Sequence, residues 1–223
     1  YYDQAIELLN TGIAADMDRG NQRAASTKYI ALAEAHILNN DPDPSALEAL
    51  ETALGISDGL SQKVGAALHY LALGRYDPAR AIADELSSNL QPQNRAYGAM
   101  IKGMVHSVRG DHAEALDALM EASRLSDFWL IRLELGKAYL RAGSFAEALD
   151  EFSAAESRRG EASAVFLDDM PSWRHLAELP YWRARAQQDV GMGHAARQSY
   201  QEYLDLRPEG RLALDARERI AAL

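Results

Sequence analysis

Few residues of this sequence have the types and spacing that catalysis or metal binding requires, and they gather in one segment. Asp168 and Asp169 are adjacent carboxylates that could hold a metal ion or act as an acid–base pair. His175 and Glu178 stand three residues apart, a spacing that can hold a metal ion on a helix. Because no third ligand follows at helical or loop spacing, we expect His175 and Glu178 to be solvated and neither pair to form a site.

The other reactive residue types give no stronger signal. The sequence has no cysteine, which excludes thiol nucleophiles and thiolate metal sites, and it has no phosphate-binding glycine loop, HExxH or GxSxG motif. His36, His69 and His106 fall near the packed sides of expected helices, which indicates packing rather than ligation. We therefore predict that the chain is not an enzyme and binds no cofactor and no metal.

Net charge and hydropathy exclude two further classes of partner. The net charge of −10 argues against non-specific binding of nucleic acid, which needs a basic surface. No apolar run approaches the roughly 20 residues that span a bilayer, so we expect no direct insertion into a membrane. The chain begins at Tyr1 without Met, and we expect it to be a fragment whose targeting information lies elsewhere. We predict that the protein is cytoplasmic. The alternative is that it is the periplasmic or exported part of a membrane-anchored regulator, and the oligomeric state stays open.

A spaced series of small and large residues runs through residues 129–160, which we expect to form two helices joined by a tight turn. The small members let the two backbones approach, the large members fill the space between the helices, and a glycine makes the turn. The small residues are Gly136, Ala148 and Ala155, the large ones are Leu135, Tyr139 and Phe152, and the turn glycine is Gly143.

This series resembles the tetratricopeptide repeat (TPR), whose spacing is L-G-x2-Y, then x8-A, x3-F and x2-A. It departs at Arg132, where the family usually has Trp, and at Gly160, where it usually has Pro. The resemblance implies an all-α fold, a right-handed superhelix of antiparallel helix pairs (a TPR-like α-solenoid), and a function in binding partners.

The length of the repeat follows from the alanines at the small-residue position of successive helix pairs. Successive intervals between Ala79, Ala115, Ala148 and Ala196 are 36, 33 and 48 residues, so an insertion precedes the last alanine. We predict a single array over 1–223. Its parts are a half repeat at 1–20, repeats at about 21–55, 57–91, 93–126 and 128–160, an insertion at 158–176, a repeat at 177–208 and a capping helix at 209–223.

Three finer expectations concern helix ends, the insertion and the capping helix. Asp77, Asp111 and Asp169 are expected to cap helices. The apolar residues of the insertion are expected to pack between repeats; they are Phe166, Leu167, Trp173 and Leu176. On the capping helix, Leu212, Ala216, Ile220 and Leu223 share one face, whereas Arg211, Asp215, Glu218 and Arg219 share the other.

The segment 158–187 is similar to the C-terminal TPR region of bacterial eukaryotic-like serine/threonine protein kinases and related transcriptional regulators. The similarity implies a regulatory or docking arm and brings no catalytic residue; Trp173, Ala177 and Glu178 depart from the commoner residues. Matching stretches are Arg159-Gly160-Glu161-Ala162, Phe166-Leu167-Asp168-Asp169, Pro171, Trp173-Arg174 and Tyr181-Trp182.

In the resembled family, ligands lie along a concave surface formed by the first helix of each pair. Residues four apart on these helices project alike, which gives the partner-binding candidates Val64, Leu68, Met100, Met104, Leu133, Lys137, Arg141, Tyr181 and Arg185. The three cations among them motivate the hypothesis of a protein or peptide partner with acidic groups or a C-terminal carboxylate. The alternatives are that these cations are merely solvated, that the apolar half closes on itself, or that it binds a small molecule or lipid as a sensor.

Overall fold

The computed structural model describes residues 1–39, 43–163 and 172–223. These residues form twelve α-helices and two 3-10 helices, with no strand among them, so the predicted all-α fold class is confirmed. They divide into two compact units, residues 1–89 (unit 1) and residues 90–223 (unit 2). Asp168 and Asp169, the expected cap at Asp169, and the apolar residues Phe166 and Leu167 lie outside the described residues.

Unit 1 consists of five helices in which α2 is central, because it packs against α1, α3 and α4. The Ser26 hydroxyl on α2 donates a buried hydrogen bond of 2.8 Å to the Ala53 carbonyl on α3, and Lys28 of α2 pairs with Asp16 of α1. The helices are α1 (Tyr2–Asp18), α2 (Gln22–Leu38), α3 (Asp43–Ile56), α4 (Leu60–Ala72) and α5 (Tyr76–Ser87). Since α2 packs on both of its sequence neighbours, the division of this unit into repeats stays a prediction.

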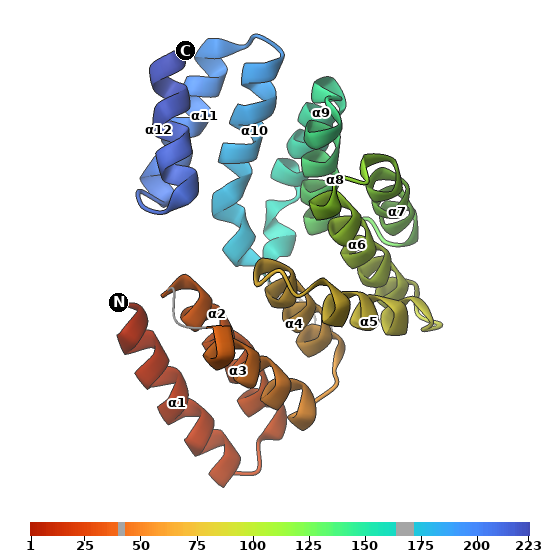
Figure 1. Ribbon diagram of the computed structural model, residues 1–223, viewed down its shortest axis with the longest axis vertical. Coiled ribbons are helices and arrows are strands. Elements are labelled where there is room, and N and C mark those ends of the chain that lie inside the picture. Colours follow the sequence, from red (N-terminus) through yellow and green to blue (C-terminus); the bar gives the residue numbers. More distant parts are fainter. Residues whose placement is uncertain (40–42, 164–171) are drawn as a thin grey trace. The chain divides into compact units, whose positions relative to one another are not determined.

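Unit 2 contains three successive helix pairs and a final single helix (Figure 1). The pairs are α6 (Pro92–Arg109) with α7 (His112–Leu125), α8 (Trp129–Ala142) with α9 (Phe145–Ser157), and α10 (Leu179–Asp189) with α11 (Gly193–Leu206), followed by α12 (Arg211–Ala222). Helix α8 contacts both α6 and α10, so the first helices of the three pairs are neighbours. The 3-10 helices η1 (Arg159–Ala162) and η2 (Trp173–Glu178) lie between α9 and α10 in the sequence.

One type of glycine turn recurs between helices. In the α8–α9 turn Gly143 has φ +80°, and the Ser144 amide donates to the Tyr139 carbonyl at 2.9 Å. The α6–α7 turn repeats this bond, from Asp111 to His106 at 3.0 Å. A hydrogen bond that closes back over five residues satisfies a free carbonyl at the helix end and needs a left-handed residue, which glycine provides. The same pattern follows Gly20, Gly74 and Gly191.

Close approach between paired helices depends on the predicted small residues. Ala79, Ala115, Ala148 and Ala196 are all buried, as the repeat pattern requires. A Cβ atom placed on Gly136 would lie 2.6 Å from Cε1 of Phe152 on the partner helix, so only glycine leaves room for that ring. The contact between α8 and α9 is therefore made by backbone against aromatic ring.

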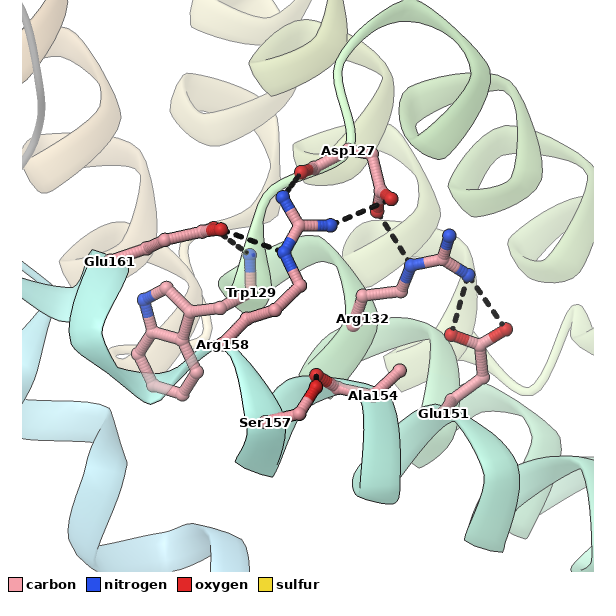
Figure 2. A network of polar contacts seen from close by, with 8 residues as sticks. All are labelled: Asp127, Trp129, Arg132, Glu151, Ala154, Ser157, Arg158 and Glu161. Atoms are coloured by element: carbon pink, nitrogen blue, oxygen red, sulfur yellow. Dashed lines mark hydrogen bonds and ion pairs between the residues drawn. The ribbon is translucent and has the colours of Figure 1, made fainter.

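Arg132, which replaces the usual Trp of the resembled repeat, joins a network of charges (Figure 2). Its guanidinium donates to both carboxylate oxygens of Glu151 on α9, at 2.9 and 3.1 Å, and to Asp127 at 2.6 Å. The hydrogen bond from Arg132 is the main reason that the pKa of Asp127 is lowered. Arg158 also pairs with Asp127, at 2.6 Å, and with Glu161, at 2.7 Å. An ion-pair network thus stabilises α8 against α9 where the family commonly uses an aromatic ring.

The two ends of the insertion meet at the start of α8. The Ser172 amide donates to the Ala162 carbonyl at 2.9 Å, and the Trp129 indole donates to the Ser172 hydroxyl at 2.7 Å. The Trp129 amide donates to Glu161 at 3.0 Å. Trp129 is buried, whereas Trp173, which was expected to pack between repeats, is 66% exposed. The expectation for Trp173 was wrong, because Trp129 and Ser172 already fill the position where the chain returns; Leu176 is half-buried.

Two expectations about caps were also wrong in detail. Helix α5 begins at Tyr76, with Arg75 before it, so Asp77 lies inside the first turn and pairs with Arg80 at 3.0 Å. Asp111 does precede α7, but its side chain makes no capping hydrogen bond, and its carboxylate lies 3.3 Å from Nδ1 of His106. The carboxylate of Asp77 is taken up by Arg80 and that of Asp111 by the His106 ring, so neither bonds to the amides at the helix start.

The capping helix α12 covers the last pair with a mixed surface. Ala213 and Ala216 join a buried cluster with Tyr181 of α10 and Tyr200 of α11, and Leu212 and Ile220 pack at its edge. Asp215 and Arg219 do not point to solvent as expected. The Tyr181 hydroxyl donates to Asp215 at 2.7 Å, and Arg219 donates to Asp215 at 2.6 Å and to Gln188 of α10 at 3.2 Å. The contact face of α12 is therefore apolar in its centre and includes two charged side chains, Asp215 and Arg219.

Candidate functional site

The partner-binding candidates fall in both units, with very different exposures. Val64 and Leu68 lie on α4 of unit 1, and both are buried. The others lie on the first helices of unit 2: Met100, Leu133, Lys137 and Tyr181 are buried, Met104 and Arg185 are half-buried, and Arg141 is exposed. In unit 2 the structure places Lys137 and Arg141 at the ring of Trp182 on α10, and Arg185 beside Tyr181 on the same helix.

Arg141 connects three helices. From α8 its guanidinium donates to the Ser107 hydroxyl of α6 at 2.8 Å, and it lies over the Trp182 ring of α10, 5.7 Å from the ring centroid. A cation at this distance from an indole face is attracted by the ring electrons. One side chain therefore joins α6, α8 and α10 along a shared surface, here called the first-helix face and defined by Ser107, Lys137, Arg141, Trp182 and Arg185.

Lys137 does not offer a free charge on this face. Its ammonium group lies 2.8 Å from Glu134 and 3.4 Å from Glu178, and 5.3 Å from the Trp182 ring centroid. Burial alone would lower the pKa of Lys137, but the charges of Glu134 and Glu178 outweigh it, so the pKa is raised. Burial likewise opposes the charge of Glu178, yet Lys137 and His175 hold its pKa below the usual value. The Lys137 ammonium group is therefore protonated, and the neighbouring carboxylates Glu134 and Glu178 already balance its positive charge.

Glu178 also corrects an expectation, since it is not a solvated residue. Its carboxylate accepts a hydrogen bond of 3.3 Å from the Trp182 indole as well as pairing with Lys137. Among the residues that the structure describes, no group of three histidine or carboxylate side chains could hold a metal ion. The described helices also include none that is both long and apolar enough for a membrane span.

Arg185 lies beside the tyrosines under α12. It donates to the Tyr181 hydroxyl at 3.4 Å, and its Nε is buried without a hydrogen-bond partner within the described ranges. Burial raises the pKa of Tyr181, which therefore stays a neutral phenol near pH 7. Neither Arg185 nor Arg141 forms an ion pair with any residue that the structure describes. The charge of Arg185 does act on Asp215 of α12, whose pKa it helps to lower.

Charge is segregated between the two helices of each pair in unit 2. The first helices α6, α8 and α10 carry eight Lys and Arg residues against two Asp and Glu residues, a net charge of +6. The second helices α7, α9 and α11 carry two Lys and Arg residues against nine Asp and Glu residues, a net charge of −7. Some of these opposite charges neutralise each other within a helix pair, because Arg132 pairs with Glu151 and Arg183 pairs with Glu202. What remains is positive on the first helices of an acidic protein.

Sequence reasoning did not single out Ser107 and Glu134, and it named Glu178 and Trp182 without placing them at this surface. Ser107 had a usable signal, because it precedes Arg141 by 34 residues, about one repeat, and residues one repeat apart face each other on neighbouring first helices. Glu134 also had one, since it stands three residues before Lys137 on one helix face. Glu178 lies 41 residues after Lys137 because the insertion intervenes, and the period alone does not lead to it.

Comparison with known proteins agrees with this architecture. Residues 63–85 match the family model of the tetratricopeptide repeat, and no curated protein matches the sequence. The fold is similar to that of TTC0263, a thermophilic TPR protein of Thermus thermophilus, with 19% identity, a TM-score of 0.64, and coverage of 89% of this chain and 98% of that one. The fold is also similar to that of the APC/C hetero-tetramer Cut9–Hcn1, with 16% identity, a TM-score of 0.72, and coverage of 99% of this chain and 40% of that one. PilW, a type IV pilus biogenesis factor, is similar with 16% identity, a TM-score of 0.56, and coverage of 95% of this chain and 98% of that one. The chain therefore has the helical-solenoid fold of TPR proteins.

Proposed function

We propose that this chain is a non-catalytic protein-interaction scaffold that binds a peptide or a neighbouring domain on the first-helix face of unit 2. The wider proposal is that it acts as a docking module of a larger bacterial signalling or regulatory protein, in line with the resemblance of its insertion. The observation that carries the binding proposal is Arg141, which is exposed, held in place by Ser107 and Trp182, and not paired with a carboxylate of the described chain.

The fixed position of Arg141 matters because a side chain that is already ordered loses little entropy when a partner binds. Trp182 adds a half-buried aromatic surface beside it, and Trp and Arg are the residue types that carry most binding energy in protein interfaces. The positive first helices favour a partner with carboxylates, either acidic side chains or a C-terminus. Arg185 supplies the second cation of the same face.

A small-molecule or lipid sensor, the alternative from the sequence, gains less support. It would need accessible apolar side chains, yet Val64, Met100 and Leu133 are wholly buried by the protein itself. Among the apolar candidates only Met104 keeps partial exposure. The cytoplasmic location stays a prediction.

The binding proposal is tested with three labelled hexapeptides of glutamate, glutamine or lysine, by fluorescence anisotropy at low salt. We expect the hexaglutamate probe to bind wild type best and R141Q/R185Q to weaken this binding at least tenfold. The matched control is R124Q/R197Q, which removes two exposed arginines from the second helices α7 and α11 of the same unit. Equal loss in both double variants would point to net charge alone and would refute the first-helix face as the site.

A further inference from the structure

Glu178 occupies a special place on the first-helix face. It is the last residue of η2 and stands directly before α10. One of its oxygens, Oε2, accepts from the Trp182 indole at 3.3 Å and lies 3.4 Å from the Lys137 ammonium group. The same indole ring lies under Arg141. A carboxylate of the chain itself thus sits at the centre of the surface on which a partner's carboxylate would be received.

Lys137 does not need this second carboxylate for neutrality. Glu134, three residues earlier on α8, already pairs with it at 2.8 Å. With Glu178 added, the group of three has a net charge of −1, which opposes the positive charge of the surrounding first helices. The cost of burying a lysine explains one carboxylate but not two.

We propose that Glu178 is a specificity-determining residue that occupies the carboxylate position of the first-helix face and must be displaced from Lys137 and Trp182 by the carboxylate of an acidic peptide. This inference rests on the proposed binding function. Glu178 selects for partners with several acidic groups, because one carboxylate of the partner has to replace Glu178 while others reach Arg141 and Arg185. A peptide with a single acid gains only one arginine contact and leaves Glu178 in place.

The test compares wild type, E178Q and E147Q with the hexaglutamate probe by fluorescence anisotropy. E147Q is the matched control, since Glu147 is exposed on the second helix α9 and the substitution changes net charge equally. Removing one negative charge within several ångströms of the bound acid should tighten binding about fivefold in E178Q, and E147Q should bind as wild type does. Equal affinity of all three proteins would overturn the proposal.

A second measurement is made on the wild-type protein, with W182F used only to assign one signal, so that it does not depend on how well E178Q folds. The indole N–H of Trp182 gives one of three tryptophan side-chain signals in a ¹⁵N-correlated NMR spectrum, assigned by its absence in W182F. Displacement of Glu178 breaks the indole hydrogen bond, and hexaglutamate should therefore shift this signal. An unmoved signal under saturating probe would overturn the proposal.

The two proposals fail in different ways. If R141Q/R185Q and R124Q/R197Q bind hexaglutamate equally, the binding face itself is wrong and this inference falls with it. If only R141Q/R185Q loses binding while E178Q equals wild type and the Trp182 signal stays in place, the face is right and Glu178 has no role in selection. Tight binding by E178Q where wild type binds weakly would support both.

Discussion

A Cβ atom on Gly136 would lie 2.6 Å from Cε1 of Phe152, which places the ring of one helix directly against the backbone of the other. The G136A substitution tests this contact. Alanine gains up to about 1 kcal/mol in helix propensity, but overpacking costs about 1–3 kcal/mol, so we expect G136A to lower the free energy of unfolding in urea. The control is G55A on α3, where no atom lies within 4 Å of the added Cβ and stability should rise. A G136A protein as stable as G55A would contradict the close contact.

A second prediction concerns Ala148, which is fully buried between α8 and α9. A148W adds a large ring where no space exists, and we expect it to cost at least about 1–3 kcal/mol in the free energy of unfolding. A146W carries the same ring on an exposed position of the same helix and should stay within about 0.5 kcal/mol of wild type. Equal melting temperatures for A148W and wild type would show that the repeat register is wrong.

Charge reversal at Lys137 should unfold part of unit 2. K137E would place a third carboxylate beside Glu134 and Glu178 and would remove the ammonium group that pairs with both. Breaking a buried pair in this way costs about 3–5 kcal/mol. We expect K137E to melt far below R141E, whose side chain is exposed. Circular dichroism melts compare the two variants, and similar melting points would mean that Lys137 is solvated.

The pH dependence of stability should carry a contribution from Glu178. Because its pKa is lowered in the folded state, Glu178 stabilises the fold above pH 4.5, and this stabilisation is lost as the pH falls through the lower folded pKa. Lys137 has a raised pKa, so its contribution persists at neutral pH and is lost only above pH 10.5. Urea unfolding at pH 7 and pH 3 should show a smaller loss of stability in E178Q than in wild type. E147Q should lose as much as wild type, and an E178Q loss equal to theirs would contradict the pairing.

The elements that were predicted well are those governed by local periodicity. The two helices joined by a turn that the residue series at 129–160 predicts are observed as α8 (Trp129–Ala142) and α9 (Phe145–Ser157). Gly143 adopts the left-handed conformation expected of the turn between them. These features depend on residues within about one helical turn or one repeat of each other, which a single sequence displays directly.

The features that were missed depend on competition between distant groups. Asp77 could cap a helix or bind Arg80, and the sequence does not rank these two interactions. Asp215 looked like a surface residue until Tyr181, 34 positions earlier, supplied a hydroxyl donor. Glu178 meets Lys137 only because the chain returns to α8 after the insertion. Each case needs the fold before the partner can be identified.

The meeting of Ala162 and Ser172 has a practical consequence. Their backbone hydrogen bond, together with the Trp129–Ser172 contact, holds the last residue of η1 and the residue before η2 at the start of α8. S172A would therefore leave the Trp129 indole without its acceptor but keep the backbone bond to Ala162, which separates the two contacts that hold Ser172 in place.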